Sequence, residues 1–317
     1  MPLFYDQLLE ALDAGAPFAL GILSGIKGSS PQKHGAKALF FADGRIVGTL
    51  GGGCLEAEIQ DRARRALLTG QPATFELVLD HDFGWDDGLI CGGKVSGLIL
   101  PRALEAGPLW REVARRDRAR AWGVGRDFSI GWADDAGAGA WLYRESVQPP
   151  CAFWIAGSGH VAQAVAPLAA GLDFEVTVFD DRAAFASGKY FPGGVKFRVG
   201  AWEEVLRDAL PGRPAFGLVV TRGHQRDALV LADWIRRPFA FLGMIGSRRK
   251  ARLIFDQFLD DKIATPDQIA RVACPVGLAI QSQTVPEIAI SIMAQYVEKR
   301  AGLLRAPAEE TVAGVAT

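Results

Sequence analysis

The sequence lacks the features that mark several classes of protein. None of its apolar runs reaches the roughly 20 residues that a membrane-spanning helix requires. Its first residues, Met-Pro-Leu-Phe-Tyr-Asp, include neither the basic nor the apolar segment of a secretion signal. No basic excess indicates a nucleic-acid partner, because 35 lysines and arginines face 36 acidic residues. We therefore expect a cytoplasmic protein that binds neither membranes nor nucleic acids.

Cysteine is also scarce. The 317 residues include four cysteines and no C-x-x-C pair, so a structural zinc site is not expected. In a cytoplasmic protein such isolated cysteines are reduced thiols. They stand at Cys54, Cys91, Cys151 and Cys274. With 49% apolar and 22% charged residues the composition is that of a globular protein, and the length suits two domains.

One stretch of the second half has the layout of a nucleotide-binding β-α-β unit. The apolar run 153–156 ends in Gly157-x-Gly159-x-x-Ala162, a helical pattern follows, and the apolar run 174–179 closes on two acids. This order of features is typical of the first unit of a dinucleotide-binding fold. Gly157 permits the tight turn, Gly159 lets a phosphate approach the backbone, and Ala162 keeps the helix close to the strand.

The same unit offers contacts to a ligand. The helix that starts at His160 presents free N–H groups to an anion, and Ser158 lies in the turn before it. We expect His160 to contact a phosphate rather than to act as a catalyst. Asp180 or Asp181 stands where such folds hold a ribose hydroxyl.

Strand-like and helix-like segments alternate through the second half, which predicts an α/β domain with a parallel sheet. The expected strands are 153–156, 175–179, 195–199, 216–221 and 239–245, and the expected helices are 160–170, 202–209, 227–236, 248–259 and 286–299. The clearest linker is Ser146-Val-Gln-Pro-Pro150. We therefore place domains at 1–145 and 151–305, and a flexible tail at 306–317, where apolar bulk is lacking.

The first half mixes helices and short strands without regular alternation. We expect a hairpin around Asp43-Gly44, because such a turn needs a residue that adopts positive φ. The expected helices are 3–12, 54–68 and 104–116, and the expected strands are 18–23, 38–42, 46–50, 75–79 and 95–100, with short strand-like pieces between 119 and 144.

Two cysteine-glycine segments of the first half are candidate sites. Gly51-Gly52-Gly53 can present successive N–H groups to an anion. Cys54 follows at a helix start, where the dipole favours a thiolate that ligates a soft metal, carries sulfur or attacks an electrophile. The alternative is a tight turn with an inert cysteine. Cys91 also adjoins glycines, so the two cysteines either share a site or belong to unrelated turns.

Three polar segments are candidates for binding an anion. The loop 27–37 is basic and rich in hydroxyls, with Lys33 and Lys37, which suits a phosphate or carboxylate, and the alternative is a solvated loop. In the segment 243–250, Ser247 can cap a helix whose first turn carries cations, and a bound anion would explain why cations oppose the dipole there. The cations next to this cap are Arg248, Arg249 and Lys250.

The third of these segments, Thr221 to Asp227, directly follows a strand of the predicted parallel sheet, where ligands of such folds lie. It contains Arg222 and His224. His224 is an acid-base group, an anion contact or a packing histidine. The cysteine at 274 precedes the last helix, and an inert thiol is the simplest interpretation there.

Taken together and in order, six segments resemble the XdhC/CoxI family, the xanthine dehydrogenase accessory proteins. The resemblance extends from about residue 3 to residue 300. The segments lie at 28–37, 48–57, 86–93, 157–162, 243–250 and 275–292. The chain departs from the expected family pattern at Ala279, where we expect an aspartate, and this departure puts an acidic contact from that loop in doubt.

The resemblance implies an amino-terminal α+β domain followed by a Rossmann-type domain. It also implies a chaperone rather than an enzyme, which holds the molybdopterin form of the molybdenum cofactor while a cysteine desulfurase adds a terminal sulfur. The chaperone then delivers the cofactor to the molybdenum subunit of a xanthine dehydrogenase-type hydroxylase. Family members are often homodimers.

The resemblance also assigns residues to this cofactor. Cys54 and Cys91 are the candidates for contacts to molybdenum or its sulfur. Gly157, Gly159 and Arg248 with Arg249 are candidates for the phosphate or pterin. The other candidate binding residues are Gly51, Gly52, Gly53, Glu56, Lys33, Lys37, Ser158, His160, Asp180, Arg222, His224 and Ser247.

Two other functions compete with the chaperone. The fingerprint alone indicates an NAD(P)-dependent oxidoreductase, or at least a bound nucleotide. That interpretation lacks a hydride-transfer site, because no Lys-Tyr or His-Asp pair is placed by spacing. The other alternative is a scaffold that recruits the hydroxylase and the desulfurase without holding the cofactor.

Overall fold

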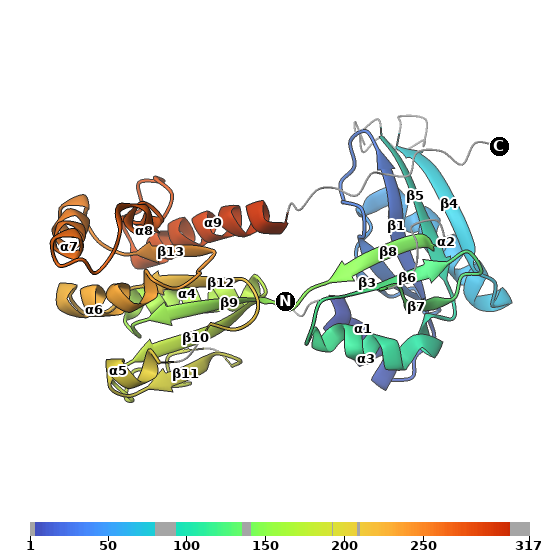
Figure 1. Ribbon diagram of the computed structural model, residues 1–317. Helices are drawn as coiled ribbons and strands as arrows, with labels where there is room; N and C mark the ends of the chain where they lie inside the picture. The colour runs from blue at the N-terminus through green and yellow to red at the C-terminus, as the bar shows by residue number, and fades with distance from the viewer. Residues whose placement is uncertain (1–3, 80–92, 135–140, 192, 208–209, 305–317) are drawn as a thin grey trace. The chain divides into compact units, whose positions relative to one another are not determined.

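The computed structural model describes residues 4–79, 93–134, 141–191, 193–207 and 210–304 (Figure 1). The chain divides into two compact units, Met1–Pro149 and Pro150–Thr317. Each unit has its own hydrophobic core. No helix among the described residues is both long and apolar enough to cross a bilayer.

Unit 1 is built on a five-stranded antiparallel sheet with the order β3-β2-β1-β5-β4. The strands are β1 Phe18–Lys27, β2 Lys37–Phe41, β3 Ile46–Gly48, β4 Ala73–Leu79 and β5 Gly93–Leu100. The predicted hairpin joins β2 to β3, and its Gly44 has a φ of 92°. The chain between β1 and β2 is the polar loop that its lysines and serines predict.

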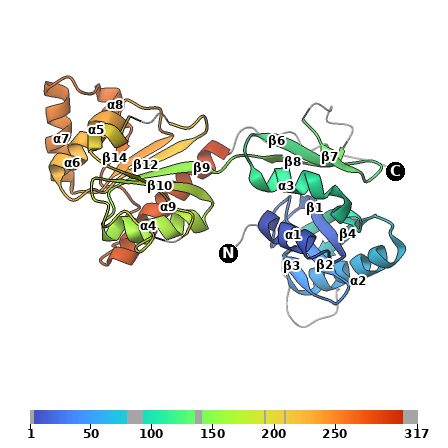
Figure 2. The same ribbon diagram turned by 90° about the horizontal axis from the view of Figure 1, so that it is seen from below.

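Both faces of this sheet are covered (Figure 2). The helix α2 (Gly53–Thr69) packs on one face through apolar residues one turn apart, such as Ile59 and Ala63. The other face packs on a core around Trp110 and Trp122. This core is contributed by α1 (Phe4–Asp13), the 3₁₀ turn η2 (Ala103–Ala106), α3 (Gly107–Arg115) and a small sheet of β6 (Arg120–Gly125), β7 (Ile130–Trp132) and β8 (Trp141–Val147).

Unit 2 contains a six-stranded parallel sheet with the order β11-β10-β9-β12-β13-β14. Numbered within the unit, this is 3-2-1-4-5-6, the order of the Rossmann fold. The strands are β9 Cys151–Ala156, β10 Phe174–Asp180, β11 Lys196–Val199, β12 Ala215–Val219, β13 Phe241–Met244 and β14 Val272–Ala273. The predicted fold class, an α+β domain followed by a Rossmann-type domain, is confirmed.

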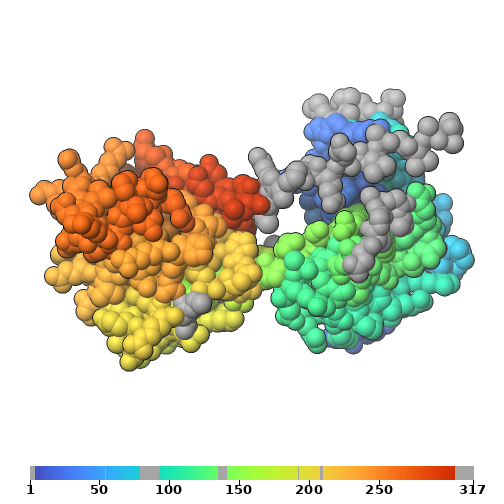
Figure 3. All heavy atoms as spheres, viewed as in Figure 1, coloured from blue at the N-terminus to red at the C-terminus, as the bar shows by residue number. Residues whose placement is uncertain are grey.

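Helices cover both faces of the parallel sheet, so all six residues of β9 are buried. One face packs on α4 (His160–Gly171) and α9 (Val285–Leu304), whose Tyr296 hydroxyl donates a 2.6 Å hydrogen bond to the Gly217 carbonyl. The other face packs on α5 (Trp202–Val205), α6 (His224–Trp234) and α7 (Arg248–Asp260). The space-filling view shows α7, the short α8 (Pro266–Ala270) and α9 along the upper side of unit 2 (Figure 3).

The element predictions differ from the structure at short or interrupted segments. The predicted helix 104–116 is a 3₁₀ turn followed by α3, because Pro108 lacks an N–H and fits only the first turn of a new helix. The helix predicted from residue 227 begins earlier, at His224. The sequence does not predict the elements α8 and β14, since five and two residues are too few to show a periodic pattern.

Candidate functional site

The predicted binding segments of unit 2 lie at one edge of its sheet. The strands β9, β10, β12 and β13 are parallel, and each is followed at its carboxyl end by one of these segments. The strand β9 lies between β10 and β12, so the chain order reverses beside it. In open α/β sheets the crevice at such a reversal is where ligands bind.

The two glycines of the fingerprint differ in what the structure requires of them. Gly157 has a φ of 113°, and a Cβ there would lie 2.9 Å from the Thr221 Cα and still closer to the Val220 carbonyl. Gly159 has an ordinary φ of −74°, and a Cβ there would meet no atom within 4 Å. The backbone therefore requires glycine at 157, whereas glycine at 159 leaves open space before the first N–H groups of α4. No side chain caps α4 at Gly159.

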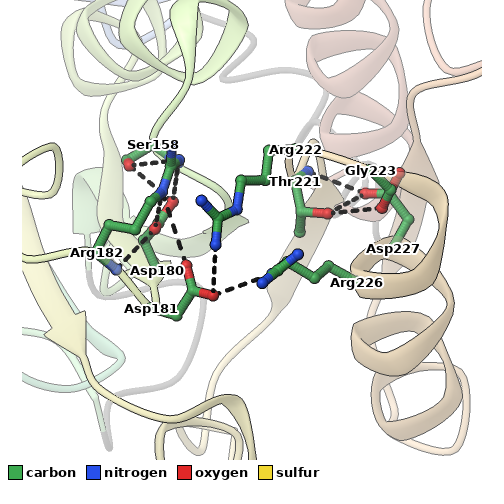
Figure 4. Close-up of polar contacts among 9 residues, drawn as sticks. All are labelled: Ser158, Asp180, Asp181, Arg182, Thr221, Arg222, Gly223, Arg226 and Asp227. Carbon is green, nitrogen blue, oxygen red and sulfur yellow. Dashed lines mark hydrogen bonds and ion pairs between the residues drawn. The ribbon is translucent and has the colours of Figure 1, made fainter.

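The carboxylate of Asp180 is saturated with hydrogen bonds inside the protein (Figure 4). Its Oδ1 accepts from the Arg182 N–H and Nε, both at 2.9 Å. Its Oδ2 accepts from the Ser158 N–H and Oγ, both at 2.7 Å, and from Arg182 Nη2 at 3.0 Å. With five donors and an exposed fraction of 1%, Asp180 has no oxygen free for a ribose hydroxyl.

This arrangement does not support the predicted ligand contacts of Asp180 and Ser158. Burial by itself raises the pKa of Asp180, but the hydrogen bonds from Arg182 and Ser158 outweigh it and hold the pKa below the ordinary 3.8. The carboxylate is thus a charged structural anchor that joins the end of β10 to the fingerprint turn. One sequence signal could have indicated that Asp180 is bound internally: Arg182 stands two residues after it and can reach it through a local turn.

Asp181 lies beside this anchor and faces the opposite loop (Figure 4). Its Oδ2 is 3.0 Å from Arg226 Nε and 3.4 Å from Arg222 Nη2. Its Oδ1 is 3.7 Å from Arg182 Nε. The sequence predicts Arg222 as a site residue, whereas it gives no sign that Arg226 meets Asp181.

Two other cations at this edge have no acidic partner in the described part of the chain. Arg248 and Arg249 are exposed at the start of α7, and neither forms an ion pair within the described residues. The predicted cap is confirmed, since Ser247 Oγ accepts a hydrogen bond of 3.2 Å from the Lys250 N–H. His160 and His224 are also exposed, at the starts of α4 and α6. These positions permit the predicted anion contacts.

Lys250, by contrast, points into the protein. Its ammonium group pairs with the fully buried Asp227 and donates to the Ile245 carbonyl at 3.1 Å. Asp227 also accepts from the Thr221 N–H and Oγ1 at 3.0 and 2.7 Å. Lys250, the third cation of the predicted basic turn, therefore connects the segments that follow β12 and β13 and is not free to bind a ligand.

The glycine run of unit 1 is folded around an internal carboxylate. Glu56 Oε1 accepts hydrogen bonds from Thr49 Oγ1 at 2.5 Å, the Leu50 N–H at 2.8 Å and the Gly52 N–H at 3.1 Å. Burial raises the pKa of Glu56, but these bonds together lower it below its ordinary value. The Gly51 N–H donates to Thr49 Oγ1. Glu56 thus occupies the Gly52 amide, one of those predicted for an external anion, and its own predicted ligand contact is not supported.

The three predicted segments of unit 1 meet at residues 29–31. A Cβ on Gly51 would lie 3.0 Å from Pro31 Cγ, and a Cβ on Gly93 would collide with the Ser29 carbonyl. Gly51 begins the segment that contains Cys54. The helix α2 starts at Gly53, so the backbone of Cys54 lies in its first turn. Cys91 lies outside the described residues. A site shared by the two cysteines stays a prediction.

Lys37 has a different environment from the one predicted. Its Nζ lies 2.5 Å from Glu145 Oε2 and donates to the Gly35 carbonyl at 2.8 Å, and its side chain is 8% exposed. Glu145 also accepts from the Tyr5 and Tyr143 hydroxyls at 2.8 and 2.7 Å. The ammonium lies within 6.0 Å of the ring centroids of Phe4, Tyr5, Trp122 and Tyr143.

This buried ion pair does not support a phosphate contact by Lys37. An ammonium group enclosed by a carboxylate and aromatic faces is already satisfied. Lys33, in the same loop, is exposed and permits the predicted contact. Among the described side chains, no group of three histidine, cysteine or acidic residues could hold a metal ion.

Family models match both units. The model of the XdhC and CoxI family matches residues 11–79, and the model of the XdhC Rossmann domain matches residues 153–296. YqeB, an uncharacterized protein of Escherichia coli (strain K12), is 28% identical over 295 residues, which are 93% of this chain. The chain spans only 46% of the length of YqeB.

Two further relatives match over most of both chains. A relative from Bacillus subtilis (strain 168), named as a probable xanthine dehydrogenase subunit, is 22% identical, over 94% of this chain and 97% of its own length. The molybdenum cofactor insertion chaperone PaoD of Escherichia coli (strain K12) is 24% identical, over 92% of this chain and 86% of its own length.

A solved structure shares the fold of the whole chain. The crystal structure described as a xanthine dehydrogenase from Bacillus halodurans superposes with a TM-score of 0.79, at 24% identity, over 96% of this chain and 98% of that one. The likeness to that structure concerns the fold alone. The two family matches, the relatives and the six segments in order agree, and the chain belongs to the XdhC and CoxI family.

Proposed function

We propose that this protein is a maturation chaperone, not an enzyme, which binds the molybdenum cofactor and delivers it to a xanthine dehydrogenase-type hydroxylase. The family supports this role, as do the names of two relatives, one a cofactor insertion chaperone and the other a probable component of xanthine dehydrogenase. In this proposal the chain binds the cofactor as cargo.

The observation that carries the proposal is the combination of an open helix start at Gly159 with a saturated carboxylate at Asp180. A helix start with free N–H groups favours a phosphate. Of the two acids that could accept from the ribose of a nicotinamide dinucleotide, Asp180 is saturated and Asp181 is paired with Arg222 and Arg226. This geometry suits a ligand that presents a phosphate without a ribose at that position, and molybdopterin ends in such a phosphate.

The exposed cations at the same edge complete this candidate phosphate site. Arg248 and Arg249 supply guanidinium groups, which form paired hydrogen bonds to phosphate oxygens. His160 and His224 stand at helix starts and can donate to the phosphate or to the pterin. Arg222 can contribute when it leaves Asp181.

The sulfur chemistry is assigned to unit 1. A cysteine at a helix start favours the thiolate form, which is a ligand for a soft metal or an acceptor of sulfur. Cys54 occupies such a start, and its segment is held in place by Glu56 and Pro31. We propose that Cys54 and Cys91 contact the molybdenum or its sulfur while a cysteine desulfurase sulfurates the cofactor. We further propose that this takes place in the cytoplasm and that the chain acts as a homodimer.

Copurification tests the proposal directly. The protein is expressed in cells that make molybdopterin, the bound pterin is released and oxidised, and its fluorescence is measured. We expect molybdopterin in the wild-type protein and less of it in Cys54→Ala and Cys91→Ala, with Cys274→Ala as the control for loss of a thiol. Absence of pterin from the wild type, together with saturable NADH binding, would favour the oxidoreductase instead.

The oxidoreductase remains the competing function because unit 2 has the dinucleotide-binding fold. Titration with NADH, followed by nicotinamide fluorescence, separates the two. We expect no saturable binding, since Asp180 has no free acceptor and the Ser158 N–H is already donated to it.

A further inference from the structure

A basic pocket lies on unit 1, where α3 packs beside the small sheet of β6, β7 and β8 (Figure 2). Six consecutive residues at the end of α3 and the start of β6 include four arginines, namely Arg115, Arg116, Arg118 and Arg120. All four line one cavity of about 230 Å³, whose wall also includes Trp132. Because the whole chain has 35 basic and 36 acidic residues, this arginine pocket is a local concentration of positive charge.

One of the four arginines is a fixed part of the wall. Arg120 Nε is 2.9 Å from Asp134 Oδ2, and Arg120 Nη1 is 3.1 Å from Glu112 Oε2. The guanidinium group also lies on the ring of Trp132, 3.4 Å from its centroid. Because two acids and an aromatic face already bind Arg120, it joins α3 to β6 and β7 and leaves little charge for a ligand.

Two of the other arginines are not bound in this way. Arg115 and Arg118 are exposed, and neither forms an ion pair within the described residues. The backbone between them is also unusual, because Arg116 has a φ of 49° at the position after α3 where glycine is the common residue. The left-handed conformation disfavours any side chain, so the chain places an arginine in the pocket wall against the preference of its backbone.

The helix end explains only part of this charge. Cations in the last turn of a helix are favoured by its dipole, and Arg115 is such a residue. The dipole effect falls off within one turn, and Arg118 lies beyond the helix. Of the two acids in the wall, Glu112 is paired with Arg120, which leaves Asp117 as a single acid beside the two exposed arginines. The pocket therefore presents an excess of positive charge to solvent.

We propose that the arginine pocket is a docking site for an acidic segment of a partner protein. Its volume of about 230 Å³ is below the roughly 300–1,000 Å³ of pockets that enclose a drug-sized ligand, so it suits a carboxylate side chain rather than a whole cofactor. A guanidinium group binds a carboxylate through two parallel hydrogen bonds, and Arg115 and Arg118 are both available for this. Further acids of the same segment are attracted by the remaining positive charge. This inference goes beyond the proposed function, since the proposed cofactor site uses none of these residues.

Fluorescein-labelled hexaglutamate tests the proposal with the full chain, and hexaglutamine with the same label is the uncharged control. Fluorescence anisotropy should show saturable binding of hexaglutamate only. Arg115→Gln combined with Arg118→Gln should weaken this binding about tenfold, the upper range for two exposed ion pairs. The matched control, Arg64→Gln with Arg65→Gln, removes two exposed arginines from α2, which covers the opposite face of the sheet. This control should leave the affinity nearly unchanged, because at 0.1 M salt charges more than about 10 Å apart are largely screened.

Asp117→Asn tests the proposal in the opposite direction. The change removes an exposed acid from the pocket wall and keeps its shape. We expect hexaglutamate to bind about two- to threefold more tightly, because a like charge beside the ligand is lost. A gain in affinity cannot result from unfolding, so this variant complements the loss expected for the two arginines.

Three results overturn the proposal. The first is an equal loss of affinity in the two double variants, which would mean that hexaglutamate responds to net charge and not to the pocket. The second is an unchanged or weaker affinity in Asp117→Asn. The third is tighter binding of a hexauridylate RNA that displaces hexaglutamate, which would assign the pocket to a nucleic acid. None of these measurements involves the pterin, so missing molybdopterin in the copurification would refute the chaperone function and leave the docking site standing.

Discussion

Replacing Lys37 by methionine separates a structural role from a role in ligand binding. The sequence predicts that Lys37 binds phosphate, whereas the structure encloses its ammonium between Glu145 and four aromatic rings. Methionine keeps most of the apolar stem and removes the charge. We expect the variant to destabilise unit 1 without direct loss of a ligand contact.

The magnitude follows from the burial of the pair. Removing one partner of a fully buried ion pair costs about 3–5 kcal/mol, because the other charge is left without compensation. The Glu145 side chain is 23% exposed and keeps its hydrogen bonds from Tyr5 and Tyr143, which relieves part of this cost. We therefore expect a loss of about 2–3 kcal/mol in the free energy of unfolding of unit 1.

Hydrogen exchange in increasing denaturant, read by mass spectrometry, measures this loss within the full chain. Peptides from β2 and β8 report on the ion pair, and peptides from β9 and β12 of unit 2 are the internal reference. The matched control is Lys94→Met in β5, whose partner Glu76 is 61% exposed, and it should cost no more than about 0.5 kcal/mol. The double variant Lys37→Met with Glu145→Gln should cost less than the sum of the single changes.

Two outcomes would refute the reasoning. In one, Lys37→Met costs no more than Lys94→Met, which would mean that the enclosed pair contributes nothing. In the other, Lys37→Met loses molybdopterin while the protection of β2 and β8 is unchanged, which would restore the ligand contact predicted from the sequence.

Three further predictions concern unit 2. Gly157→Ala should lower the free energy of unfolding of unit 2 by about 2 kcal/mol in a denaturant titration. Gly159→Ala should leave this free energy unchanged but should reduce pterin retention. Equal destabilisation by both variants would contradict the conclusion that only Gly157 is required by the backbone. Because the pKa of Asp180 is lowered in the folded state, the stabilisation by its carboxylate is complete above the ordinary pKa of 3.8 and is lost as the pH falls through the folded-state pKa. Melting temperatures measured against pH should show this loss in the wild type but not in Asp180→Asn. Burial raises the pKa of the Cys274 thiol to about 11. At pH 8 iodoacetamide should therefore alkylate Cys274 about twentyfold more slowly than it alkylates the thiol of glutathione. Equal alkylation rates for the two thiols would refute this.

Local patterns predict the fold of unit 2 well. The apolar run of β9, the glycine pair and the helix after it lie within about twenty residues, and each is set by backbone geometry and periodicity. The alternation of strands and helices then allows few sheet orders, because crossovers between parallel strands are right-handed. Segments too short for a pattern, such as α8 and β14, escape this kind of prediction.

The roles of individual charged residues are harder to predict, because they depend on partners far away in the sequence. Nothing near Lys37 indicates that Glu145 will meet it, and nothing near Lys250 indicates the buried Asp227. A basic loop has the same composition whether its cations face solvent or a carboxylate. Glu56 is the local exception: an acid placed just after a glycine run is a visible candidate for binding the amides of that run itself.

The contacts of the loop 29–31 with Gly51 and Gly93 determine which substitutions unit 1 can tolerate. At both glycines the limiting neighbour belongs to another segment, namely Pro31 and the Ser29 carbonyl. A side chain introduced at either glycine would push this loop away from its position. Because that obstacle at Gly93 is a backbone atom, changing the residue at 29 would not make room there. Saturation mutagenesis should therefore find Gly93 intolerant in every background, and Gly51 as well, because a φ of 136° strains any other residue there even when the residue at 31 is smaller.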